Sequence, residues 1–506
     1  MRILTATVLL ASLAAAQHPA AQHPAAAQQA EQVLCDRIKH EGLQNSKVMD
    51  YLDYLTNSIG QRLTGSDNFE LACQWAKREF EKMGLDVHLE KWAEWKVRFN
   101  RGQWSGRVLK PVHMELQVAT EAWTAGTKGQ VTAEAIKLPK DTLDLELLAD
   151  QVRGKWLVGT LPSRRARGAR EYLRYLNRFC EEERVAGLVL ASRGDAKFPN
   201  RIRVFGNRNM ALAANSKTPT IPKIVVRRDQ HQKIVKLLDK GKVVLRFDIR
   251  NRFRRERVPL WNVVADIVGR EKPNEYVIVC GHLDSWHQAT GATDNGTGVT
   301  STMEAARILS AVGAKPRRTI RFILWGGEEQ GLLGSRAYVA KHRGEMKRVS
   351  AVFNHDTGTN WAYQIAVPTN MYDDFARILK PVLSIPAPDK DFSGPVFKLR
   401  KIKQMSRRGG GSDHASFLAA GVPAWPWGLR GRSDYFQFTW HSQWDTFDAA
   451  IPEYQRHTST VVALTAYGVA QLPYLLPRDQ MAGPGSTGSR RRAAPAPKKT
   501  TTTKKN

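Results

Sequence analysis

The spacing of apolar residues predicts helices in the first part of the chain. Apolar positions recur at helical spacing across residues 31–100, most clearly around 48–55 and 69–83. After Gly84 the period changes to two, because apolar and polar residues alternate over positions 85–89. The pattern indicates helices followed by a strand, and we assign residues 31–111 to the N-terminal part of one domain.

Between residues 112 and 247 the pattern changes to short apolar runs separated by turn residues. A helical period occurs near residues 229–238. We predict that residues 112–247 form a separate, mostly β module inserted into the first domain. Its expected strands are 130–136, 155–160, 187–191 and 223–226.

Strands and helices alternate after the basic stretch 250–257, in a part that we bound at residues 248–476. This alternation predicts an α/β domain in which helices cover both faces of a mixed sheet, giving three layers. Either Asp294 or Thr297 is expected to cap the first helix. The expected strands are 258–268, 275–281, 319–324 and 350–353, and the expected helices pass through 303–309 and 332–342.

Both ends of the chain differ in composition from the parts that are expected to fold. A basic residue precedes the apolar run 3–16, which predicts a signal peptide over residues 1–16 and a secreted or periplasmic protein. Residues 17–30 contain a short repeat and are typical of a linker. Residues 477–506 are expected to be a basic, disordered tail. No later segment has the roughly 18 uninterrupted apolar residues of a transmembrane helix.

The formal net charge of +29 arises from 77 Lys and Arg residues against 48 Asp and Glu residues. Many of the basic residues are dispersed, and residues 490–505 contain seven Lys and Arg residues without any acid. No helix-turn-helix, zinc-finger or aromatic-basic RNA platform accompanies them, so we expect no nucleic-acid partner. The charge instead favours a cationic surface that associates with an anionic envelope.

The four cysteines show no metal-type spacing. Cys280 ends an apolar strand and is expected to be a buried thiol. Cys35 and Cys73 fall in the same helical region, and the sequence leaves open whether they form a disulfide.

Potential metal ligands follow the ends of several expected strands. His282, Glu328, Glu329 and Asp356 occupy such positions. The carboxyl ends of strands in an open α/β sheet meet at one edge, so these separate segments are expected to converge. Carboxylates at the end of a buried strand need partners, and metal ions supply them.

Two imidazoles, two aspartates and one glutamate form a ligand set for two divalent ions: His282, His441, Asp294, Asp356 and Glu329. A carboxylate bridges two ions with its two oxygens, so we place Asp294 at the centre. Glu328 stays unligated beside Glu329 and is free to accept a proton. Asp284 is expected to hold His282 by accepting a hydrogen bond from its other ring nitrogen.

These motifs together resemble the co-catalytic zinc exopeptidases of the bacterial aminopeptidase and carboxypeptidase Q type, and the carboxypeptidase Q type is the nearer match. The resemblance covers roughly residues 31–475 and includes 58–66, which is similar to the N-terminal signature of that group. It implies a phosphorylase/hydrolase-like fold in which 112–247 is a protease-associated domain. The other similar segments are 281–298, 325–331, 354–358, 411–417 and 440–446.

The resemblance also implies how the ligands are shared between two zinc ions per chain. Asp294 would bridge the ions, and the peptide bond that follows it would be cis. Glu329 and His441 would complete one site, and His282 and Asp356 would complete the other.

For the remaining site residues, the resemblance implies roles in catalysis. Glu328 would be the general base that later donates its proton to the leaving amine, and Asp284 would orient His282. Candidates for substrate contact or for stabilising an oxyanion are His414 and Tyr435. His287 departs from the family pattern, because the family has an acidic residue directly after the tryptophan that corresponds to Trp286.

The sequence therefore predicts a secreted exopeptidase that hydrolyses small peptides or dipeptides. An aminopeptidase of the same family is the main alternative, because the sequence does not determine which free terminus of the substrate is recognised. A glutaminyl cyclase with one zinc ion and a non-catalytic receptor-like protein are further alternatives from other classes. Whether the chain acts as a monomer or a homodimer stays open.

Overall fold

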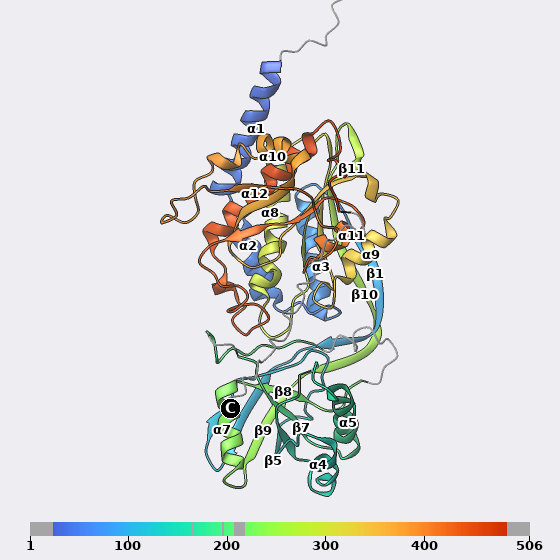
Figure 1. Ribbon diagram of the computed structural model, residues 1–506, viewed down its shortest axis with the longest axis vertical. Coiled ribbons are helices and arrows are strands. Elements are labelled where there is room, and N and C mark those ends of the chain that lie inside the picture. The colour runs from blue at the N-terminus through green and yellow to red at the C-terminus, as the bar shows by residue number, and fades with distance from the viewer. Residues whose placement is uncertain (1–23, 164, 195–196, 207–217, 483–506) are drawn as a thin grey trace, which may run out of the picture.

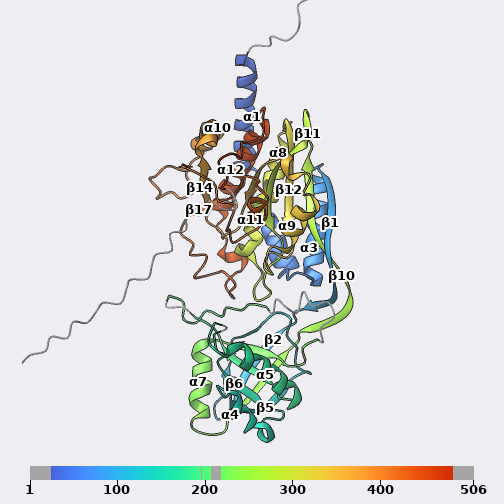
Figure 2. The ribbon, with the colours of Figure 1, turned by 45° about the vertical axis from the view of Figure 1, so that its right-hand side comes forward.

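The computed structural model describes residues 24–163, 165–194, 197–206 and 218–482, which form two lobes (Figure 1 and Figure 2). Strands β1 (Asp86–Asn100) and β10 (Arg252–Ile267) run from one lobe toward the other along one side of the molecule. The expected signal peptide and the chain after residue 482 lie outside the described residues.

Within the described residues, the larger lobe contains a mixed sheet of six strands. β11, β12, β13 and β16 are parallel, whereas β10 is antiparallel to both of its neighbours. The mixed sheet confirms the predicted α/β class. In spatial order its strands are β1, β10, β12 (Arg318–Trp325), β11 (Lys272–His282), β13 (Val349–Asn354) and β16 (Ala424–Pro426).

Helices surround this sheet, and a small sheet packs beside it. The helices are α1 (Pro24–Gln44), α2 (Val48–Asp53), α3 (Asp67–Lys82), α8 (Thr297–Ala311), α9 (Leu333–Lys341), α10 (Tyr372–Ile378), α11 (His414–Ala419) and α12 (Pro452–Gln471). The small sheet consists of β15 (Lys398–Ile402), β14 (Trp361–Pro368) and β17 (Gly428–Arg430).

Strand β12 shows why helices cover both faces of the sheet. Successive side chains of a strand point to opposite faces. The ring centroid of Phe322 lies 6.4 Å from that of Phe80 on α3, on the face that also carries α8 and α12. Trp325 points to the other face, where its ring centroid lies 5.3 Å from that of Tyr338 on α9. The sheet is therefore the middle of three layers.

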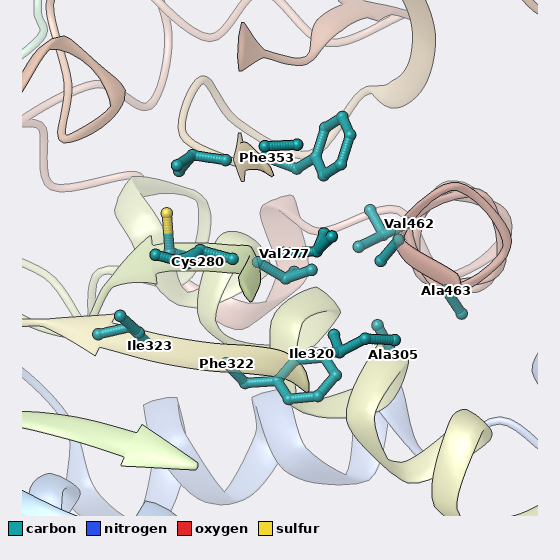
Figure 3. Close-up of a cluster of buried hydrophobic side chains, with 14 of the residues drawn as sticks. Val277, Cys280, Ala305, Ile320, Phe322, Ile323, Phe353, Val462 and Ala463 are labelled. Atoms are coloured by element: carbon teal, nitrogen blue, oxygen red, sulfur yellow. The ribbon is translucent and has the colours of Figure 1, made fainter. Parts of the chain in front are cut away.

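The core of this lobe lies between the central strands and the helices that pack on them (Figure 3). Val277 of β11, Ala305 of α8 and Val462 of α12 are all buried there. Fully burying one apolar side chain of this size contributes about 1.5–3 kcal/mol to folding. Because helices cover both faces of β11, its apolar run does not alternate with polar residues.

The smaller lobe is built on an eight-stranded sheet in the described part of the chain. Its spatial order is β3 (Met114–Glu115), β2 (Trp104–Lys110), β9 (Val244–Ile249), β5 (Val131–Lys137), β6 (Trp156–Gly159), β7 (Gly187–Ala191), β8 (Lys223–Val226) and β4 (Val118–Thr120). Helices α4 (Thr142–Glu146), α5 (Ala169–Glu182) and α7 (Arg228–Leu238) belong to the same lobe. The expected strands near residues 130, 155, 187 and 223 are confirmed, whereas α5 was not expected. The identity of this lobe as a protease-associated domain stays a prediction.

Three local predictions were wrong. Helix α1 begins at Pro24, so the second half of the expected linker 17–30 is helical. Strand β1 continues to Asn100 because it pairs with β10 over its whole length, and the helical region therefore ends near Lys82. The N-cap residue of α8 is Gly296, and no side chain caps the helix.

All four cysteines are buried, free thiols. Cys35 and Cys73 belong to the same apolar core without forming a disulfide. Burial raises the pKa of the Cys35 thiol to about 11, so it stays protonated at neutral pH. The expectation of a buried Cys280 thiol is confirmed.

Among the described residues, no helix is both long enough and apolar enough to cross a membrane.

The expected tail begins later than residue 477, because residues 477–482 pack on the larger lobe. Arg478 donates hydrogen bonds to the backbone oxygens of Met346 and Val349, at 2.8 and 2.6 Å. The backbone of Met405 bonds to Gln480 and Ala482, at 2.9 and 2.8 Å.

We expect a chain that ends at Ala482 to keep the melting temperature of the full-length protein, since this anchored segment is retained. A chain that ends at Leu476 should lose on the order of 2–4 kcal/mol of unfolding free energy, because several hydrogen bonds and the buried Met481 are removed. Urea unfolding of the three proteins checks this expectation. Equal stability of the two shortened chains would contradict it.

Candidate metal centre

The candidate ligands lie at one edge of the larger sheet. His282 is the last residue of β11, Glu328 and Glu329 lie in the turn after β12, and Asp356 follows β13. Because these strands are parallel, their carboxyl ends meet at the same edge, as the sequence predicted.

Asp294 reaches the same place from a single irregular turn, η3 (Ala292–Gly296). The peptide bond between Asp294 and Asn295 is cis, in agreement with the resemblance. The carboxylate of Asp445 accepts hydrogen bonds from the backbone nitrogens of Thr293 and Asp294, at 2.6 and 3.1 Å. This pair of contacts holds the backbone that leads into Asp294.

The five candidate ligands form two groups of three that share Asp294. His282, Asp294 and Asp356 form one group, and Asp294, Glu329 and His441 form the other. In each group the potential ligand atoms lie within 4.8 Å of one another. One carboxylate oxygen of Asp294 lies 3.4 Å from Nε2 of His282, and its other oxygen lies 3.2 Å from Nε2 of His441. Asp294 is thus placed to offer one oxygen to each group.

Several buried ligand atoms in these groups lack a hydrogen-bond partner in the protein, and a metal ion would supply one. Nε2 of His282, Oδ2 of Asp294 and Oε1 of Glu329 are inaccessible to solvent and have no hydrogen-bond partner among the described residues. Leaving such atoms unsatisfied costs about 1–3 kcal/mol each, and more if they are charged. Imidazole nitrogen and carboxylate oxygen are the ligand types that zinc binds in proteins.

Without a bound cation, the pKa values of the candidate ligands are shifted because their charged groups lie close together. Burial, together with the charge of the nearby Asp294, raises the pKa of Glu329 to about 7, although His441 opposes the increase. Burial lowers the pKa of His441, but Glu329 and Asp294 outweigh it and raise the value to about 9. The carboxylates therefore hold protons on neighbouring groups, and a bound cation would displace those protons.

Glu328 lies beside the groups but belongs to neither of them. Its Oε2 is 4.0 Å from Nε2 of His282. Burial raises the pKa of Glu328 well above its usual value; His282 lowers it, and Asp356 raises it further. A carboxyl group with this environment is suited to accept and return a proton near neutral pH.

Asp284 is fully buried, and its carboxylate does not hold His282 as expected. The Asp284 carboxylate lies 3.7 Å from Nδ1 of His282, whereas the backbone oxygen of Asp284 lies 2.9 Å from that nitrogen. The carboxylate accepts hydrogen bonds from Thr64 and from the backbone nitrogens of Glu328 and Glu329. The backbone oxygen of Asp284 therefore contacts the imidazole, and its carboxylate instead holds the turn that carries the two glutamates.

The two candidates for substrate contact lie near the ligands. His414 is the first residue of α11 and is buried, and burial lowers its pKa to about 4. Tyr435 is also buried and packs against Gly358, two residues after Asp356. Their roles in binding substrate stay predictions.

Arg62 is a functional candidate that the sequence reasoning missed. It is fully buried and donates hydrogen bonds to the backbone oxygens of Leu283, Thr290 and Gly291. These contacts fix both ends of the loop that joins His282 to the η3 turn. Its position in the N-terminal signature 58–66 was the available signal. Asp445 is a second residue that the sequence did not single out, although it lies in the family-like segment 440–446.

A segment of the smaller lobe contacts the candidate centre. The backbone nitrogen of Val204 donates to the backbone oxygen of His441, at 3.4 Å, and the ring centroids of Phe205 and His441 are 4.9 Å apart. The guanidinium of Arg203 lies 3.9 Å from the ring centroid of Trp440. The cavity left beside Asp294, Glu329 and His441 has a volume of about 10 Å³, roughly the space of one water molecule.

Comparison with known proteins shows which family the larger lobe resembles. Residues 262–466 match the model described as Peptidase family M28. The matched segment contains all five candidate metal ligands, and this similarity supports a metallo-exopeptidase.

Relatives and solved structures agree with this assignment. The chain is 28% identical to carboxypeptidase Q of Mus musculus over 450 residues, which covers 86% of this chain and 88% of that protein. The structure of a Peptidase M28 precursor from Shewanella amazonensis SB2B has a TM-score of 0.62 at 23% identity, covering 89% of this chain and 98% of that chain. The zinc aminopeptidase BSAP from Bacillus subtilis has a TM-score of 0.54 at 18% identity, covering 83% and 94%. The two structures support the fold.

Removing Asp294 should affect both metal groups, whereas removing Asp356 should affect one. We expect Asp294→Ala to lose nearly all bound zinc after dialysis and Asp356→Ala to keep about half of the wild-type content, because only the shared carboxylate serves both groups. Zinc quantified by mass spectrometry and circular dichroism of each variant check the expectation. Equal zinc loss in two folded variants would remove the shared role from Asp294.

Proposed function

We propose that this chain is a secreted or periplasmic exopeptidase that holds two zinc ions and hydrolyses small peptides or dipeptides. The observation that carries the proposal is the position of Asp294, which belongs to both groups of potential ligands. His282 and Asp356 would complete one zinc site, and Glu329 and His441 would complete the other. The buried ligand atoms without hydrogen-bond partners support this arrangement.

The zinc ions, when bound, supply a water of lowered pKa and polarise the scissile carbonyl. Glu328 is the proposed proton acceptor, because its largely buried side chain lies beside His282 without belonging to either ligand group. The same carboxyl group would return the proton to the leaving amine. Asp284 would keep Glu328 and Glu329 in position through their backbone nitrogens.

Similarity to carboxypeptidase Q over most of both chains favours activity of that type on a peptide with a free C-terminus. An aminopeptidase is the alternative, because zinc aminopeptidases share the fold. Retention of all five candidate ligands favours catalysis over a receptor-like role, and two complete groups favour two zinc ions over the single zinc of a cyclase.

Export is proposed from the N-terminal sequence, where a basic residue and the apolar run 3–16 are typical of a signal peptide. The high positive charge supports association with an anionic envelope.

Replacing Glu328 by Gln should remove the proton acceptor without removing a ligand. We expect Glu328→Gln to keep its zinc and its melting temperature while kcat falls by about 10²–10⁴-fold. Zinc content, thermal unfolding and steady-state kinetics of the same preparation check this. Retention of more than about a tenth of kcat would exclude Glu328 as the general base.

A panel of blocked peptides tests the class of substrate. We expect a free dipeptide to be hydrolysed and its C-amidated form to react about 10–150-fold more slowly, because a lost charge-assisted contact costs about 1.5–3 kcal/mol. A larger loss with the N-acetylated form would identify an aminopeptidase instead. Efficient hydrolysis of a peptide blocked at both ends would contradict the exopeptidase proposal.

A further inference from the structure

A second cavity lies where the strands β1 and β10 pass between the lobes. It has a volume of about 540 Å³ and is lined by backbone and side chains of both strands. Its charged and ionisable lining residues are Asp67, Arg101, Arg250, Arg252, Arg254 and His287. We call it the hinge cleft.

Positive charge in the hinge cleft exceeds the negative charge that faces it. Arg254 is paired with Asp67 at 2.7 Å, and Arg250 is paired with Asp248 at 3.1 Å. Arg252 forms no ion pair or side-chain hydrogen bond with the residues that the structure describes. Its cross-strand neighbour Asn100 also lines the cleft, and one N–H of the Asn100 amide donates to Asp67 at 2.6 Å, which leaves the second N–H for a ligand.

Arg101 adds a second positive charge without an acidic partner. Its Nη1 donates to the backbone oxygens of His287 and Gln288, at 3.1 and 3.2 Å, and its guanidinium lies 4.0 Å from the ring centroid of Trp104. Its Nε is buried without a hydrogen-bond partner among the described residues. Burial lowers the pKa of Arg101 only to about 10, so the group is charged at neutral pH.

His287 contributes unused hydrogen-bonding atoms to the same cleft. It is fully buried, and neither ring nitrogen makes a well-formed hydrogen bond with the described residues, although a contact with the backbone of Thr120 favours the protonated imidazole. Burial and then the neighbouring Arg101 lower its pKa to about 3, so the imidazole is neutral and carries one N–H donor. An unsatisfied buried group of this kind favours a ligand that accepts a hydrogen bond.

The hinge cleft is separate from the metal centre, although one loop borders both. Trp286 and Gln288 line the small cavity at the metal centre, whereas His287 between them lines the hinge cleft. None of the five candidate metal ligands lines the hinge cleft.

We propose that the hinge cleft binds a phosphate group, either as inorganic phosphate or as part of a small phosphomonoester. Two arginines without acidic partners supply the charge, and their guanidinium groups match the geometry of phosphate oxygens. Asn100 and the neutral His287 add uncharged donors. The cavity is large enough to hold a phosphomonoester as well as the free ion. This proposal does not depend on peptide hydrolysis.

Calorimetric titration of the zinc-loaded protein with phosphate, at constant ionic strength maintained with chloride, tests the proposal. The variant is Arg252→Gln, because Arg252 is exposed and makes no contact on which the fold depends. The matched control is Arg255→Gln, which removes the same charge from the same strand at an exposed position outside the cleft. Phosphate bound at the metal centre would contribute equally to all three titrations.

We expect saturable binding to the wild-type protein, a dissociation constant about 10-fold or more higher in Arg252→Gln, and a change of less than about twofold in Arg255→Gln. Tighter binding of glycerol phosphate than of inorganic phosphate would identify a phosphomonoester as the ligand, and the reverse order would identify the free ion. Equal weakening in the two variants, or no saturable binding at millimolar phosphate, would overturn the proposal. Thermal unfolding of each variant verifies that it is folded.

Discussion

The buried carboxylate of Asp294 is the group on which the rest of the catalytic lobe depends. Burying a carboxylate away from water costs much free energy unless cations or hydrogen-bond donors surround it. His282 and His441 face its two oxygens, and Asp445 holds the backbone nitrogen of Asp294 itself. Burial and the charge of Asp294 together raise the pKa of Asp445 to about 7, so a negative charge on one of the two carboxyl groups disfavours a negative charge on the other. A cation bound at the candidate ligands would reduce this repulsion.

Buried hydrogen bonds from side chains to the backbone hold the candidate ligands in place. Arg62 donates to three backbone oxygens of the loop after His282, and a buried guanidinium held in this way cannot move without leaving those oxygens unsatisfied. Asp284 holds the turn that carries Glu328 and Glu329. The buried carboxylate and guanidinium thus fix the positions of ligands that come from different strands.

The two lobes are connected at the metal centre as well as through their hinge. Val204 and Phe205 of the smaller lobe contact His441, and the hinge cleft lies on the other side of the loop that carries Trp286. Residues that determine access to the metal centre therefore come from both lobes. A ligand in the hinge cleft would contact His287, whose neighbours in sequence border the metal centre.

The sequence by itself determined the strand and helix alternation, the strand ends at which potential ligands stand, and the central place of Asp294. These features depend on local periodicity and on the parallel direction of strands, which the order of elements implies. It did not predict the length of β1, which pairing with β10 decides, or the contact between His282 and the backbone of Asp284. Arg62, Asp445 and Phe205 could be placed at the site only by the tertiary structure. Their contacts join residues far apart in the chain, and such contacts depend on the path of the folded backbone, which no local pattern encodes.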